Sequence, residues 1–382
     1  MSYNSKDRFE LIDCVRGVAS IWILCFHMLP WLYSEYSSIQ TFLDFGKIGT
    51  DFFYVTSGFV CAVAYQKIKE KKGAGFLKVR LTKIYKIYWL SLLFALFFMP
   101  LFWWFFSFLK GEPVLDFPVV DISEIFLFVT LLKVFSNDTW HLWKAFGGVN
   151  AVYHFLATLV QIFIFTRLAM YLPKYFNKIL LIAFLASIFS LTPYLKPLIP
   201  IGLFLPKFCE FYLGFVLCWM IYGRNKVIFE RVRPYFVIAG IVIFSFVIYS
   251  HVSASEGPFY RFLSALSIAI LLFCLYPKSS FISNLPIFKQ LSFVGGFSYS
   301  IYLNHILFYP VATIITMNIV NIDKKIAAPF LIVPVTVFLC YLFYILFEKN
   351  YFSYFSSFIL KKIWTKKLKK VNFMIIHEEL FF

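Results

Sequence analysis

The stretch that decides the fold is residues 87–109, IYWLSLLFALFFMPLFWWFFSFL, which run for 23 residues without a charge. A helix needs about 20 apolar residues to cross the hydrocarbon core of a bilayer. The whole chain agrees with this run, since 61% of its 382 residues are hydrophobic, 14% are charged and its mean hydropathy is +0.79. A soluble domain is about 45–50% apolar and about 25% charged. The composition therefore excludes a soluble enzyme, a secreted domain and a disordered protein.

Further apolar segments of roughly spanning length lie on both sides of this run. With the run itself included, the predicted spans are 11–32, 48–66, 84–109, 150–171, 179–195, 202–222, 235–251, 259–276, 298–320 and 327–347. The apolar stretch 122–135 is shorter, and it predicts a re-entrant piece, an interfacial helix or an extra half-span. We expect an all-α integral membrane protein with about ten transmembrane helices.

Lysine and arginine are distributed unevenly between the predicted loops. If the N-terminus is cytoplasmic and the spans alternate, 27 of the 36 Lys and Arg residues fall on the cytoplasmic side. Cytoplasmic loops of membrane proteins carry this excess. We therefore expect both termini in the cytoplasm. The net charge of +17 is explained by these loops and by anionic lipid headgroups, so no nucleic-acid partner is expected.

We divide the chain into a membrane domain, residues 1–348, and a basic cytoplasmic tail, residues 349–382. The tail's lysines suit docking on anionic lipid, or equally a flank that fixes topology. The seven cysteines include no CxxC pair, and no cluster has metal-ligand spacing. We expect neither a disulfide framework nor a metal site, and we make no prediction of the oligomeric state.

The first span carries three ionisable side chains, Asp13, Arg16 and His27. Such groups are unfavourable inside a bilayer and usually face a cavity or a partner. Arg16 and His27 are eleven residues apart, so they share one helix face and lie roughly 16 Å apart along the axis. Asp13 is spaced for an ion pair with Arg16. This face suits an anionic donor entering from the cytosol, with proton transfer deeper in the membrane; the alternative is a snorkelling arginine and a structural histidine.

Asp51 opens the second span at its predicted outer end, at a depth similar to that of His27. A carboxylate beside an imidazole fixes its tautomer and raises its basicity. We therefore expect Asp51 to support His27. The alternative is an aspartate in the headgroup region that caps the following helix.

Two further stretches have the composition of a site. Arg80, Lys83 and Lys86 recur every three residues at the cytoplasmic mouth of the third span, where they suit a phosphate-bearing ligand. The alternative is an ordinary positive flank of a span. In the ninth span, Ser298 and His305 are seven residues apart on one face. This face predicts a cavity wall, or else hydrogen bonds between helices.

Four motifs occur in a chain order that resembles a known family. They are Arg-x10-His from Arg16 to His27, GTDFFYVTSGF at 49–59, the basic and Tyr-rich entrance to the third span with Arg80, and SYSIYLNH at 298–305. Together with the spans they resemble the acyltransferase-3 family, integral membrane O-acyltransferases that modify bacterial surface glycans. The resemblance covers residues from about 9 to 347. It departs at Lys83, where many members have a second arginine that can form a bidentate fork.

The resemblance implies a donor site at the cytoplasmic side. Acetyl-CoA would be a co-substrate, and no permanently bound cofactor is expected. The donor would be bound by Arg16, Arg80, Lys83 and Ser57. A longer relative with a fused esterase-like domain would need more residues than this chain has.

The resemblance also implies roles in catalysis and in acceptor binding. His27 would act as a general base or pass the acyl group on, with Asp51 or Asp13 supporting it. Residues that would line the acceptor site or pore are Ser298, Tyr299, Tyr302, His305 and Gln161. The acceptor would be a sugar hydroxyl on a lipid-linked or exported glycan, at a bacterial inner membrane. Two alternatives stay open: a transporter of glycan or acyl carrier, and an acyl relay to a separate periplasmic transferase.

Overall fold

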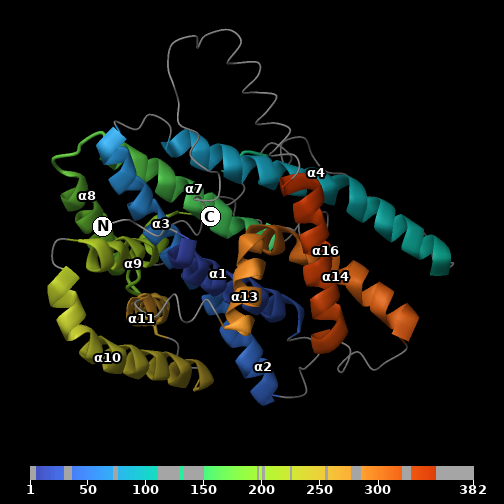
Figure 1. Ribbon diagram of the computed structural model, residues 1–382. Coiled ribbons are helices and arrows are strands. Elements are labelled where there is room, and N and C mark those ends of the chain that lie inside the picture. The colour runs from blue at the N-terminus through green and yellow to red at the C-terminus, as the bar shows by residue number, and fades with distance from the viewer. Residues whose placement is uncertain are drawn as a thin grey trace, which may run out of the picture.

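The computed structural model shows an assembly of helices (Figure 1), with no strand among the residues that it describes. The described residues are 6–29, 37–71, 76–110, 129–132, 150–195, 198–199, 203–223, 226–253, 257–276, 285–320 and 328–349. The all-α fold class is therefore confirmed over these ranges.

Each of the ten predicted spans coincides with a helical segment. The segments are α1 (Lys6–Met28), α3 (Gly49–Lys71), α4 (Phe76–Lys110), α7 (Asn150–Met170), α8 (Phe176–Ser190), α9 (Leu205–Tyr222), α10 (Lys226–Val252), α11 (Tyr260–Leu275), α14 (Ser298–Val320) and the consecutive η5 (Ala328–Ile332), α16 (Val333–Phe343) and η6 (Tyr344–Lys349). Within the described ranges, six helical stretches are long and apolar enough to cross a membrane. Several others, such as α8 and α11, are apolar but shorter. The chain is thus built from membrane-spanning helices, and the number ten stays a prediction.

Two of the described helices lie outside the predicted spans. They are α2 (Ser37–Asp44), which leads through the 3-10 turn η1 (Phe45–Ile48) into α3, and α13 (Pro286–Gly296). Both helices are too short to cross a bilayer on their own. α13 packs directly along α1, because Gly17 and Gly295 let the two backbones touch. A side chain at either glycine would collide with the backbone of the opposite helix.

A second close contact between backbones joins α3 to α9. A Cβ atom on Gly58 would collide with the carbonyl oxygen of Phe211, and one on Gly214 would collide with that of Val55. Small residues at facing positions allow helices in a membrane to approach closely and gain van der Waals contact. The core of the protein lies beside this contact, where the Phe211 and Phe215 side chains are fully buried. The contact fixes the height and rotation of α3.

Hydrogen bonds in the core connect α14 to its neighbours. Ser91 on α4 donates to the side-chain oxygen of Asn304 at 2.6 Å, and Ser300 donates to the backbone oxygen of Cys340 on α16 at 3.1 Å. The side chains of these residues are buried. Interhelical bonding was one of two interpretations of the polar residues in the ninth span, and for Ser300 and Asn304 it is confirmed.

The short stretch 122–135 lies largely outside the described residues. Its described part, 129–132, packs on α4, where the Trp89 indole N–H donates to the carbonyl oxygen of Val129 at 3.0 Å. Leu131 has a positive φ of 62°. The predicted basic tail also lies outside the described residues, apart from Lys349.

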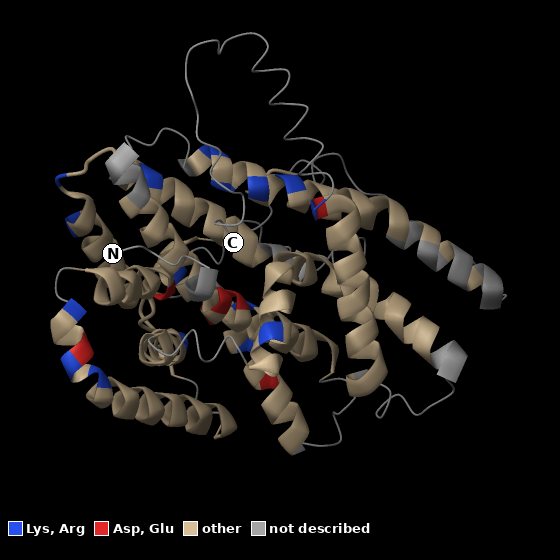
Figure 2. Cartoon of the chain, in the orientation of Figure 1, with Lys and Arg blue, Asp and Glu red and all other residues tan. Residues whose placement is uncertain are grey.

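The cationic side chains gather at particular helix ends. Figure 2 shows the Lys and Arg residues of α4 and α10 near the beginning of each helix, toward the left of the view. On α4 they include Lys78, Arg80, Lys83 and Lys86. Both helices begin on the side that the count of charges assigns to the cytoplasm. The orientation of the termini itself stays a prediction.

Candidate active site

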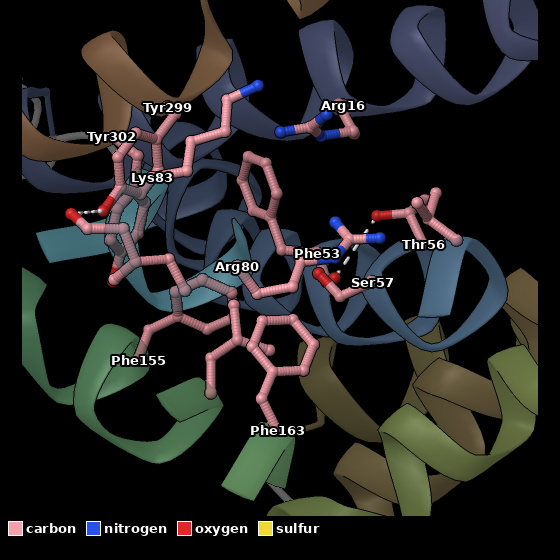
Figure 3. Close-up of a pocket in the computed structure, with 13 residues that line it drawn as sticks. Arg16, Phe53, Thr56, Ser57, Arg80, Lys83, Phe155, Phe163, Tyr299 and Tyr302 are labelled. Atoms are coloured by element: carbon pink, nitrogen blue, oxygen red, sulfur yellow. Dashed lines mark hydrogen bonds between the residues drawn. The ribbon is translucent and has the colours of Figure 1, made fainter. Parts of the chain in front are cut away.

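A pocket lies between α1, α3, α4, α7 and α14 (Figure 3). Its lining residues are Arg16, Phe53, Thr56, Ser57, Val60, Arg80, Lys83, Ile84, Phe155, Leu159, Phe163, Tyr299 and Tyr302. All four residues predicted to bind the donor are among them, and so are two of the five predicted to line the acceptor site or pore. The structure thus brings together positions that lie as much as 286 residues apart in the chain.

Helical spacing explains why these side chains share one wall. Arg80 and Lys83 are three residues apart on α4, and Tyr299 and Tyr302 are three apart on α14, so each pair projects from one helix face. Tyr299 is held in place because its hydroxyl donates to the carbonyl oxygen of Ile84 at 3.1 Å. This bond joins α14 to the N-terminal part of α4, beside Arg80 and Lys83.

Aromatic rings flank the arginines of the pocket. The guanidinium of Arg16 lies 6.0 Å from the ring centre of Phe53, and that of Arg80 lies 5.8 Å from the ring centre of Phe163. At these distances the face of each ring attracts the guanidinium charge. The pocket encloses about 80 Å³. That space suits a few water molecules or one phosphate-sized group, so a whole coenzyme would have to widen it.

Two carboxylates lie near these cations. Asp13 is 3.8 Å from Arg16, which confirms the ion pair expected from their spacing. Glu348, buried at the end of η6, interacts electrostatically with Arg16, Lys83 and Lys86. Glu348 was not predicted as a site residue, although a carboxylate at the end of an apolar segment is the signal that would have found it. These acids balance part of the positive charge around the pocket.

Aromatic contacts connect the pocket to a pair of histidines. The Tyr302 ring packs on Phe53 and Phe155, with centroid distances of 5.9 and 5.2 Å. On its other side it is 6.5 Å from the ring of His305. The His305 ring in turn lies 5.2 Å from that of His27. One turn of α14 therefore separates the basic pocket from two imidazoles.

The two histidines have different surroundings. His305 is completely buried, and its Nδ1 lies 2.9 Å from the carbonyl oxygens of both Ile301 and Tyr302. His27 is exposed, and the ring of Phe26 packs against it at 4.8 Å. An accessible imidazole backed by a buried one is an arrangement suited to proton transfer.

The structure gives Asp51 an arginine partner that was not predicted from the sequence. Its carboxylate is fully buried and pairs with Arg261 on α11, with Oδ1 accepting from Nε at 2.8 Å and lying 2.5 Å from Nη2. The same guanidinium contacts the hydroxyl of Thr50. Arg261 was not predicted as a site residue, because a pairing across 210 residues has no local sequence signal. These contacts engage Oδ1 of Asp51, and Oδ2 has no hydrogen-bond partner among the described residues. Support of His27 by Asp51 therefore stays a prediction.

Two other polar residues also serve the packing of helices. Gln161, predicted to line the pore, accepts a hydrogen bond from the backbone N–H of Phe204 at 3.2 Å, just before α9. Glu210 on α9 is buried and pairs with Lys207 at 2.8 Å. Ser298 is buried in α14 and is not part of the pocket wall. Among the described residues, no group of three or more His, Cys, Asp or Glu is placed to hold a metal ion.

Comparison with known proteins agrees with the arrangement of the motifs. The sequence matches the family described as "Acyltransferase domain" over residues 9–347, nearly the whole chain and the range expected from the motifs. The chain belongs to this acyltransferase family. The pocket of the acyltransferase and its two histidines lie entirely inside the matched range.

A curated relative gives a more limited comparison. Over 96 residues, the acyltransferase is 35% identical to "Protein 2 in picA locus" of Rhizobium radiobacter. This match covers 24% of the acyltransferase and 46% of the relative, so the alignment spans about half of that protein. No solved structure matches the acyltransferase.

Proposed function

We propose that this membrane acyltransferase is an O-acetyltransferase, which moves an acetyl group from acetyl-CoA to a sugar hydroxyl of a bacterial surface polysaccharide. Lipopolysaccharide and capsule are the acceptor classes that fit, and the membrane would be the bacterial inner membrane. The observation that supports this most directly is the pocket in which Arg16, Arg80 and Lys83 converge. Three cations in one partly apolar cavity suit the phosphates of a coenzyme A thioester.

The donor would enter at the end of the pocket where α4 begins. The two guanidinium groups and the lysine would hold its phosphates, and Ser57 would supply a hydroxyl donor on the α3 side. Asp13 would keep Arg16 in place through their ion pair. Tyr299 and Tyr302 would line the path of the acyl-thioester end toward the histidines. Coenzyme A would act as a substrate that comes and goes.

His27 would carry the proton chemistry. Its imidazole would take the proton of the sugar hydroxyl while that oxygen attacks the acyl carbonyl carbon. The carbon–sulfur bond would then break, and the departing thiolate would receive the proton. His27 is exposed, as a base must be if it meets an acceptor from outside the bundle. A variant of this mechanism, in which His27 first accepts the acyl group, uses the same contacts.

The test uses inverted membrane vesicles that hold the wild-type protein or His27→Ala, with radiolabelled acetyl-CoA and endogenous glycan. We expect label in the glycan fraction with the wild type and at least about 100-fold less with the variant. A matched control is His251→Ala, because His251 lies away from the pocket and contacts the backbone of Thr41. This control should transfer label like the wild type.

Other outcomes of this experiment would replace the proposal. Label that stops on the protein would identify an acyl relay to a separate transferase. With folded protein and acceptor present, label in neither fraction would contradict acetyl transfer and favour a transporter, whose His27→Ala variant would alter flux alone.

A further inference from the structure

His305 is held in one tautomer by its own helix. Its Nδ1 lies 2.9 Å from two backbone carbonyl oxygens, those of Ile301 and Tyr302. A carbonyl oxygen can only accept a hydrogen bond, so Nδ1 must carry the proton. A neutral imidazole has a single N–H group, and Nε2 is therefore left with a bare lone pair.

The Nε2 atom of His305 is buried without a hydrogen-bond partner in the described structure. The whole side chain is 0% exposed. A buried polar atom of this kind is uncommon and needs an explanation, because its desolvation is uncompensated. The neighbouring imidazole is that of His27, whose ring centroid lies 5.2 Å from that of His305 at an interplanar angle of 36°.

The two carboxylates that were expected to support His27 each form an ion pair with an arginine. Asp51 is bound to Arg261, and Asp13 is paired with Arg16. The other rings beside the histidine pair are those of Phe26 and Tyr302, which pack on His27 and His305 respectively. Among these neighbours, His305 offers its Nε2 atom as a hydrogen-bond acceptor. Its other ring nitrogen, Nδ1, already donates to the backbone carbonyls.

We propose that His305 is a positioning residue for His27, an inference that rests on the proposed acetyl transfer. After a rotation of the exposed His27 ring, Nε2 of His305 accepts the N–H of that ring. The other nitrogen of His27 then carries the lone pair that receives the acceptor's hydroxyl proton. The same bond stabilises the His27 imidazolium while the new ester bond forms and the thioester bond breaks, until the proton passes to the leaving thiolate.

Two conservative variants separate this role from a structural one. In His305→Asn, the amide N–H can still donate to the backbone carbonyls, as Nδ1 does, but no acceptor remains at the position of Nε2. In His305→Gln, the amide oxygen can reach that position and accept from His27. A structural role predicts that Asn is the better substitute, whereas the positioning role predicts that Gln is.

The first measurement is steady-state acetyl transfer by wild-type, His305→Gln and His305→Asn protein in vesicles. We expect Asn to lower kcat about 100-fold and Gln to stay within about tenfold of the wild type. The KM for acetyl-CoA should change little, because His305 is not part of the pocket wall. Equal activity of the two variants, or higher activity of Asn, would overturn the proposal.

The second measurement does not depend on the reaction. The chain has six histidines, so ¹⁵N-histidine spectra of the purified protein are simple, and His27→Ala assigns the His27 signals. We expect one tautomer of His27 in the wild type and in His305→Gln, and a mixture in His305→Asn. An unchanged His27 spectrum in His305→Asn would refute the positioning role. If the wild type transferred no acetyl group, the proposed function would fail, and these spectra would still decide whether His305 orients His27.

Discussion

Individual cations in the pocket differ in the geometry they offer to a phosphate. Arg16 and Arg80 present planar forks that can bind two oxygens at once, whereas Lys83 is a point charge on a flexible stem. Arg80 also packs against the ring of Phe163, which limits its motion. Of the two α4 cations, we therefore expect the arginine to contribute more to donor affinity.

This expectation can be tested on α4 alone. Arg80→Ala should raise the KM for acetyl-CoA about 10- to 100-fold, because a charge-assisted hydrogen bond contributes about 1.5–3 kcal/mol. Lys78→Ala is the matched control, since Lys78 is exposed on the same helix and lies outside the pocket. Acetyl-CoA titrations of the initial transfer rate give both values. Similar KM values for the two variants would argue against phosphate binding by Arg80.

A second prediction concerns the buried pair of Asp51 and Arg261. Asp51→Ala leaves the guanidinium without its carboxylate partner, and we expect a loss of about 1–3 kcal/mol in the free energy of unfolding. Arg261→Leu in the same chain should restore part of that loss, because the unpaired charge is removed. The control is Glu230→Ala, which breaks the exposed ion pair with Lys226 and should change stability by less than about 0.5 kcal/mol.

Thermal unfolding in detergent micelles gives the order of these variants. An unfolding temperature of Asp51→Ala as high as that of Glu230→Ala would show that the buried pair does not stabilise the fold.

The residues of the site could be predicted from the sequence only in part. Arg16, Arg80 and Tyr302 carry the local signal of a polar group within or beside an apolar segment, and the structure places them in one pocket. Which groups pair is decided by packing between distant helices. Asp51 has a histidine at similar predicted depth, yet it meets Arg261, since α3 packs against α11 as well as against α1.

At the scale of helices, the length of the apolar runs was enough to predict where most helices lie in the sequence. All ten predicted spans contain a helix, because burying an unpaired backbone in lipid is strongly unfavourable. The same criterion cannot find α13, whose eleven residues are too few to cross a bilayer. α13 nevertheless holds α1, the helix that carries Arg16 and His27, through the contact at Gly17 and Gly295.

The contact between α3 and α9 gives a prediction at this scale. Gly58→Ala should destabilise the protein by about 1–3 kcal/mol, because its methyl group would collide with the backbone of α9 and force the helices apart. Ser57 is the neighbouring residue and lines the pocket, so the KM for acetyl-CoA should rise as well. Gly296→Ala on α13 is the control, since a Cβ there meets nothing within 4 Å.

Thermal unfolding in detergent micelles measures the loss of stability of Gly58→Ala, and acetyl-CoA titration of the transfer rate measures its KM. Wild-type stability of that variant would mean that α3 and α9 are less closely packed than the structure shows.

At the scale of the whole molecule, polar groups divide into two sets. Arg16, Arg80, Lys83 and Glu348 belong to helix ends that alternation of ten spans assigns to the cytoplasm. Asp51, Arg261, Lys207 and Glu210 lie near the beginnings of α3, α11 and α9, which alternation assigns to the opposite side. The members of each set contact or approach one another, although they are scattered along the sequence. Each span carries the chain to the other side of the membrane. An odd number of spans between two members of a set would therefore have placed them on opposite sides.

This division predicts the outcome of topology mapping by reporter fusions. Alkaline phosphatase, which is active only outside the cytoplasm, should be active when fused after residue 255, between α10 and α11, and inactive when fused after 224 or at 382. A fluorescent protein that folds only in the cytoplasm should give the reverse pattern. The physical reason is that the excess of Lys and Arg stays on the cytoplasmic side. An active phosphatase at 382 would mean an odd number of spans. It would place the beginning of α4, with its two pocket cations, on one side of the membrane and the end of the chain on the other, and Glu348 could not then lie beside Lys83.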